Sequence, residues 1–173
     1  MKRRTFLQRS LLSAGLLISG TFPLSALEAK KLQRLTILHT NDWHSRIEPF
    51  PMDGGRNQGL GGIARRAQMV QQIRKESEEV LLLDSGDIFQ GTPYFNFYKG
   101  EPEMKLMSAL GYDAATIGNH DFDAGVEGLH KVLPFASFPL VSSNYDFSDT
   151  VLHNQILKHK IFDKGGIKVG VFG

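Results

Sequence analysis

Three clusters of polar residues in this sequence combine side chains that can bind metal ions or transfer protons. They are Asn41 with Asp42 and His44, the stretch from Asp84 to Asp87, and the stretch from Asn119 to Asp123. Their side chains offer carboxylate, imidazole and carboxamide groups, and the sequence contains no cysteine. This ligand set suits divalent ions such as Mn, Zn, Fe or Ca and excludes a thiolate site. For any one cluster taken alone, an ordinary surface turn is the alternative explanation.

Each cluster follows a segment whose pattern predicts a β-strand. Residues 34–39 alternate and are rich in β-branched types, residues 80–86 form a short apolar run, and residues 113–118 form a third such segment. The other expected elements are helices at 63–79, 101–110 and 124–133, a fourth strand at 138–144 and a hairpin at 155–173. Alternating strands and helices predict an α/β fold with a mostly parallel sheet. Such sheets bind ligands at the carboxyl ends of their strands, so the clusters are expected to converge there.

The residue types and spacing predict a metal centre that hydrolyses phosphate esters. Asp42 and His44 are two residues apart, so both can face one ion in an extended segment. The two carboxylate oxygens of Asp87 can bridge two ions, and Asn119 offers a neutral carbonyl that leaves positive charge for an anionic substrate. Two ions about 3.5–4 Å apart are the usual arrangement for this chemistry.

The segments that carry the clusters resemble consecutive motifs of the calcineurin-like metallophosphoesterases. These segments are ILHTNDWH, LLLDSGDIFQGTPYFNFYKGE and ALGYDAATIGNHDFDAG, and the similarity runs from about Leu35 to Gly173. They are most similar to the branch of exported 5′-nucleotidases and UDP-sugar hydrolases. The resemblance implies a layered α/β sandwich, two divalent ions and a small phosphate ester or nucleotide as the substrate.

The resemblance also implies which residues bind the ions. Asp42 and His44 match the ligands of the first metal, and Asp87 matches the carboxylate that bridges both. Asn119 matches a ligand of the second metal that also touches the phosphate of the substrate.

Two further residues match the catalytic acid of the family and its partner. His120 matches the histidine that protonates the leaving group or stabilises the transition state, and Asp123 matches the carboxylate that orients its ring. Trp43 stands where many relatives carry a polar residue, and it is expected to alter the mouth of the site.

Several residues near the clusters have plainer interpretations. Asp84 is expected to be a cap or a supporting group, and Asp121 is expected to face solvent or support its loop. The glycine-rich stretch at 59–62 precedes a predicted helix, and it either cradles an anion or is a plain loop. The aromatic stretch at 95–98 is expected to contribute to packing.

The N-terminus has the organisation of an export signal. A basic segment, a moderately apolar segment broken by Gly15, Gly20 and Pro23, and a run of small residues follow one another. The signal is assigned to residues 1–26, and RRTFL resembles the twin-arginine type. The apolar run is too short and interrupted for a stable membrane span. We therefore expect a periplasmic or cell-envelope protein.

The charge distribution argues against a nucleic-acid polymer as the partner. The formal net charge is +2, but four basic residues and no acidic residue precede Leu27, so the remainder carries −2. A surface that binds polymer phosphates would instead be enriched in Lys and Arg.

Residues 27–173 are expected to be the N-terminal portion of a metallophosphoesterase catalytic domain. Ile167–Phe172 is predicted to be a strand without a following helix, and the family implies further histidine ligands, so the gene is expected to continue past Gly173. The alternative functions are a phosphodiesterase or UDP-sugar hydrolase of the same superfamily, and a non-catalytic exported protein that binds metal or nucleotide. The predicted pair of His120 and Asp123 argues against the last, because binding alone needs no acid.

Overall fold

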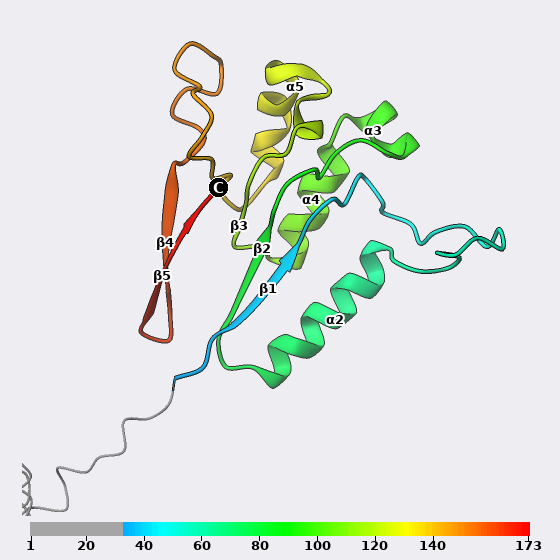
Figure 1. Cartoon of the computed structure of the whole chain (residues 1–173), viewed down its shortest axis with the longest axis horizontal. Helices are drawn as coiled ribbons and strands as arrows, with labels where there is room; N and C mark the ends of the chain where they lie inside the picture. Colours follow the sequence, from blue (N-terminus) through cyan, green and yellow to red (C-terminus); the bar gives the residue numbers. More distant parts are fainter. Residues whose placement is uncertain (1–32) are drawn as a thin grey trace, which may run out of the picture. The chain divides into compact units, whose positions relative to one another are not determined.

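Three parallel strands bring the three clusters to one edge of a sheet. In a computed structural model that describes residues 33–173, β1 (Thr36–Thr40), β2 (Val80–Asp84) and β3 (Ala114–Ala115) pair in the order β1-β2-β3 (Figure 1). Thr40 pairs with Asp84, and Asp84 pairs with Ala115, so the strands end side by side. The predicted α/β fold with parallel strands is confirmed, and the predicted export signal lies outside the described residues.

The helices lie between the strands in the chain, as the sequence predicts. They are α2 (Ile63–Glu76), α3 (Pro93–Tyr98), α4 (Glu101–Leu110) and α5 (Gly125–Val132), with short 3₁₀ turns η2 (His120–Phe122) and η3 (Leu133–Phe135). Helix α4 has Pro102 in its first turn and ends at Gly111, whose φ of 72° suits a glycine C-cap. Arg74 of α2 donates hydrogen bonds to the carbonyls of Leu110 and Gly111, so α2 is tied to the end of α4. None of the described helices is long and apolar enough to cross a membrane.

The core forms where the helices pack against the sheet. Buried members from β2, α4 and α5 include Leu81, Leu82, Met104, Met107 and Leu129. Leu81 and Leu82 are both buried although they are adjacent, which requires cover on both faces of the sheet. The wholly apolar run at 80–83 indicates this arrangement in the sequence.

The fourth predicted strand is reduced to an isolated bridge. Val141 donates to the carbonyl of Ala115, and Ala115 donates to the carbonyl of Pro139, so this segment runs parallel to β3. Pro139 has no N–H group to continue the ladder, which explains why no regular strand forms. The predicted C-terminal hairpin is confirmed as antiparallel β4 (His159–Lys164) and β5 (Ile167–Phe172).

Helix α3 is the element that the sequence pattern misses. It has six residues and begins at Pro93, so it is too short to show a helical period. The prediction that the aromatic stretch at 95–98 packs holds for Phe95, which is buried. It is wrong for Phe97 and Tyr98, which are exposed.

Candidate active site

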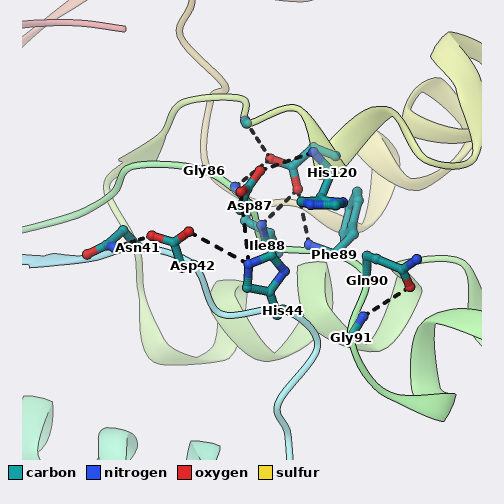
Figure 2. Close-up of polar contacts among 12 residues, drawn as sticks. Asn41, Asp42, His44, Gly86, Asp87, Ile88, Phe89, Gln90, Gly91 and His120 are labelled. Carbon is teal, nitrogen blue, oxygen red and sulfur yellow. Dashed lines mark hydrogen bonds and ion pairs between the residues drawn. The ribbon is translucent and has the colours of Figure 1, made fainter.

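Three predicted metal ligands converge where β1 and β2 end. One donor atom each from Asp42, His44 and Asp87 lies within 4.8 Å of the other two. His44 Nε2 is 3.7 Å from Asp42 Oδ1 and 3.9 Å from Asp87 Oδ2, and Figure 2 shows both carboxylates directed toward the imidazole. Ligands at about 2.0–2.2 Å from one ion are separated by less than twice that distance. The separations of 3.7 and 3.9 Å from His44 Nε2 and the donor set therefore fit a divalent cation.

Hydrogen bonds between two loops fix the backbone that carries these ligands. Asp42 N–H donates to the Gly86 carbonyl at 3.0 Å, and His44 N–H donates to the Asp87 carbonyl at 3.0 Å. Asp42, His44 and Asp87 have φ values of 51°, 50° and 57°, in the left-handed region that non-glycine residues rarely adopt. Such conformations cost of order 1–3 kcal/mol each and cluster at functional sites. This strain supports a functional role for the two loops.

Trp43 anchors the turn that carries Asp42 and His44. Its side chain is only 2% exposed, its indole N–H donates to the Arg46 carbonyl at 2.8 Å, and the Arg66 guanidinium lies 4.9 Å from its ring centroid. The expectation that Trp43 shapes the mouth of the site is wrong, because the indole is part of the core. Because the indole is buried, its neighbours Asp42 and His44 lie on the outer side of the turn.

Asp121 is a buried support that the sequence pattern leaves undecided. Its carboxylate is 2% exposed and accepts four backbone N–H groups, from Asp87, Ile88, Phe89 and Gly118, at 2.8–3.1 Å. Burial raises the pKa of Asp121 to about 6, although these four donors favour the ionised form. Of the two alternatives, the structure supports the loop-supporting one, since Asp121 joins the third cluster to the loop that carries Asp87.

Glycine at position 118 permits the close approach of these two loops. A Cβ atom at Gly118 would lie 2.0 Å from Asp87 Oδ1, which no side chain can tolerate. The same oxygen accepts the backbone N–H of His120 at 3.1 Å, whereas Asp87 Oδ2 faces His44. The two oxygens of Asp87 thus point to different clusters.

His120 and Asp123 form the pair that the resemblance implies. His120 Nδ1 lies 2.9 Å from Asp123 Oδ2, since the turn η2 brings residues three apart onto one side. The hydrogen bond with Asp123 is the main cause that raises the pKa of His120. The His120 ring stands edge-on to the His44 ring, with their centroids 5.2 Å apart. The predicted acid therefore lies beside the predicted metal ligands.

Asn119 and Asp84 complete the predicted clusters in different ways. Asn119 is exposed between Gly118 and His120, at the same edge of the sheet, and it stays a predicted ligand. Asp84 is buried and accepts hydrogen bonds from the Thr40 hydroxyl at 2.5 Å and from Gly86 N–H at 2.9 Å. It joins the ends of β1 and β2, in agreement with the supporting role expected of it.

The glycine-rich stretch at 59–62 is better explained as a plain loop. Gly59 N–H donates to the Phe50 carbonyl at 2.9 Å, and Ile63 N–H donates to the Ile47 carbonyl at 2.8 Å. These two amides are therefore engaged within the protein and do not point to an anion. In Figure 1 the stretch belongs to the long connection between β1 and α2.

Comparison with known proteins supports the same family. The profile of the calcineurin-like phosphoesterases matches residues 35–171. A snake venom 5′-nucleotidase from Gloydius brevicauda is 45% identical over 146 residues, which cover 80% of this chain and 25% of that protein. The human 5′-nucleotidase is 45% identical over 148 residues, which cover 80% of this chain and 26% of that protein. The chain thus spans about a quarter of the length of these relatives.

Solved structures show the same fold. A 5′-nucleotidase precursor from Thermus thermophilus superimposes with a TM-score of 0.74 at 38% identity, covering 80% of this chain and 28% of that chain. The NAD nucleotidase of Haemophilus influenzae gives a TM-score of 0.72 at 34% identity, covering 80% of this chain and 26% of that chain. The profile match covers most of the sequence and includes all three clusters. The chain therefore belongs to the calcineurin-like phosphoesterase family.

Proposed function

We propose that this protein hydrolyses phosphate esters at a centre of two divalent ions, with nucleotides as the favoured substrate class. The observation that carries the proposal is the convergence of Asp42, His44 and Asp87 donor atoms within 4.8 Å, beside the paired His120 and Asp123. Family membership supports hydrolysis, and the 5′-nucleotidases among the relatives support the nucleotide class.

The first ion would be held by Asp42, His44 and Asp87, and the second by Asp87 and Asn119 together with ligands outside this set. When bound, the ions supply Lewis acidity toward the phosphoryl oxygens and activate a water molecule. Asp87 suits the shared position, because its two oxygens face different clusters. The neutral Asn119 carboxamide would leave positive charge for the anionic substrate.

His120 would handle the proton of the reaction. Its Nδ1 is hydrogen-bonded to Asp123, so Nε2 is the ring atom that can hold a proton toward the substrate. Asp123 fixes the tautomer and raises the pKa of His120, which favours the protonated ring before the reaction. A proton delivered from Nε2 to the leaving oxygen would neutralise the alkoxide that forms when the phosphorus–oxygen bond breaks.

The test is the release of inorganic phosphate by the full-length protein from AMP, UMP, a UDP-sugar and p-nitrophenyl phosphate. We expect activity that EDTA abolishes and that added Mn²⁺ restores, with the highest kcat/KM for a nucleoside monophosphate. Exposed His159 on β4 provides a control, since His159→Gln should leave the rate unchanged. Activity that is unaffected by chelation would contradict the proposal.

We further propose that residues 1–26 direct export by the twin-arginine route. The support comes from the basic and apolar organisation of this segment and from Arg3 and Arg4. Replacing both arginines with lysine should retain the protein inside the cell, as cell fractionation would show. Unchanged export of this variant would point to the general secretory route.

A further inference from the structure

Two hydroxyl groups at the ends of β1 and α4 take no part in the proposed mechanism. Tyr112 is 4% exposed and follows the glycine that ends α4, and Thr40 is the last residue of β1. The Tyr112 hydroxyl lies 2.7 Å from Thr40 Oγ1, and Thr40 Oγ1 lies 2.5 Å from Asp84 Oδ2. An unbroken chain of hydrogen bonds therefore runs from the end of α4 to the buried carboxylate at the end of β2.

The direction of these hydrogen bonds follows from the number of hydrogens. Thr40 has a single hydroxyl hydrogen, which it donates to the carboxylate of Asp84. The Tyr112 hydroxyl therefore donates to Thr40 Oγ1, because no other hydrogen is available for that contact. Hydroxyl groups that donate in sequence polarise one another and strengthen the whole chain. Both hydroxyl groups thus act in the same direction, toward the carboxylate.

The other oxygen of Asp84 fixes the backbone that contacts Asp42. Asp84 Oδ1 accepts the N–H of Gly86 at 2.9 Å, and the Gly86 carbonyl accepts the N–H of Asp42 at 3.0 Å. A Cβ atom at Gly86 would lie 2.5 Å from the backbone nitrogen of Gly118, so Gly86 has little room to move toward that loop. Asp42 has a φ of 51°, a strained conformation that surrounding contacts must maintain. The chain of hydrogen bonds thus ends at a predicted metal ligand.

We propose that Tyr112 and Thr40 are positioning residues for the metal centre, which act on Asp42 through this chain of hydrogen bonds. The proposal rests on the proposed function, since that function assigns Asp42 to a metal ion. The chain fixes the backbone of Asp42, whereas the Asn41 amide contacts its side chain. A ligand that is already held in place loses less conformational entropy when the ion binds, so the ion binds more tightly.

Four variants of the full-length protein separate positioning from packing. Tyr112→Phe removes one hydroxyl and keeps the ring, and Thr40→Val removes the central hydroxyl while keeping a similar shape. Thr40→Ser keeps the hydroxyl and serves as the conservative replacement. The fourth variant combines Tyr112→Phe with Thr40→Val. Tyr98→Phe is the matched control, because Tyr98 lies on α3 and is 57% exposed. The readouts are the Mn²⁺ affinity measured by isothermal titration calorimetry and the urea midpoint of the metal-free protein.

Removing the central hydroxyl should have the larger effect on metal binding. Supporting partners of metal ligands typically affect affinity by about 10–100-fold, and Thr40→Val should weaken Mn²⁺ binding about tenfold. Tyr112→Phe removes only the outer hydrogen bond and should weaken it about threefold. The double variant should bind like Thr40→Val, because the Tyr112 hydroxyl acts only through Thr40. Thr40→Ser and Tyr98→Phe should bind Mn²⁺ like the wild type.

A merely structural role would lower the urea midpoint of Thr40→Val without changing its Mn²⁺ affinity, and that result would overturn the inference. Additive losses of affinity in the double variant would also overturn it, because they would show that the two hydroxyl groups act separately. Should Thr40→Val fail to fold, the Mn²⁺ affinities of Tyr112→Phe and Tyr98→Phe decide the question in the same way. A wild type that binds no Mn²⁺ would overturn the proposed metal centre itself, whereas tight wild-type binding with unchanged affinity in Thr40→Val contradicts only the positioning role.

Discussion

Asp121 accepts the backbone N–H of Asp87 at 3.1 Å, and this hydrogen bond joins the loop of the predicted acid to the loop of a predicted metal ligand. The same carboxylate accepts the N–H groups of Ile88 and Phe89, so it organises three consecutive residues of that loop. His120, directly before Asp121, donates its own N–H to Asp87 Oδ1. The relative position of His120 and Asp87 therefore depends on this buried carboxylate and on their direct hydrogen bond.

Asp121→Asn should destabilise the protein and loosen the metal site. The NH₂ group of asparagine would face backbone N–H groups that now donate to a carboxylate oxygen. Leaving buried donors unpaired costs about 1–3 kcal/mol. Urea unfolding should show this loss in the free energy of unfolding, and Mn²⁺ binding should weaken. Exposed Asp149 supplies the control, because Asp149→Asn should change neither quantity. A stable Asp121→Asn variant with wild-type Mn²⁺ affinity would show that the loops do not need this residue.

His120→Asn should lower kcat about 10²–10⁴-fold, the usual effect of removing a general acid, while metal content stays nearly intact. Asp87→Asn should reduce bound metal instead, because it removes charge from the position between both clusters. Steady-state kinetics and metal analysis of the two purified variants distinguish the roles. Loss of metal from the His120 variant would mean that the ring is a ligand and not the acid.

The burial of Glu103 predicts that the stability of the metal-free protein depends on pH. Burial raises its pKa above the ordinary value of 4.5, so the folded state holds the proton more tightly than the unfolded state. Its contribution to stability is fully present below pH 4.5 and is lost as the pH rises through the folded pKa. The Glu103→Gln variant cannot titrate at this position. As the pH rises, the free energy of unfolding of the wild type should therefore fall relative to that of this variant. Urea titrations at several pH values test this, and parallel curves for both proteins would contradict it.

Much of the fold follows from local pattern. Helix α4 begins and ends where the sequence predicts, because Pro102 and Gly111 mark its two ends. The wholly apolar run at 80–83 indicates the central strand, and polar residues just beyond three strand ends indicate the site. The prediction of a strand at 138–144 is wrong. Pro139 has no N–H group to donate to a neighbouring strand, and whether this matters depends on which strand lies beside it.

The supports of the site depend on contacts between residues distant in sequence. Trp43 stands between two polar residues, which suggests exposure, but the positive φ values of Asp42 and His44 turn it into the core. Asp121 becomes a support only because the loop after β2 passes over it. Nothing near Glu103 in sequence indicates that its carboxyl is fully buried. Spacing identifies candidate ligands, whereas the groups that hold them emerge from tertiary packing.

The most direct test of the metal centre is anomalous diffraction from crystals of the full-length protein grown with Mn²⁺. The account predicts a strong peak between Asp42, His44 and Asp87, at about 2.0–2.4 Å from a donor atom of each. A second peak should lie on the side of Asp87 Oδ1, the oxygen that accepts the N–H of His120. An active, Mn²⁺-dependent protein with no anomalous density between Asp42, His44 and Asp87 would contradict the assignment of these residues as ligands.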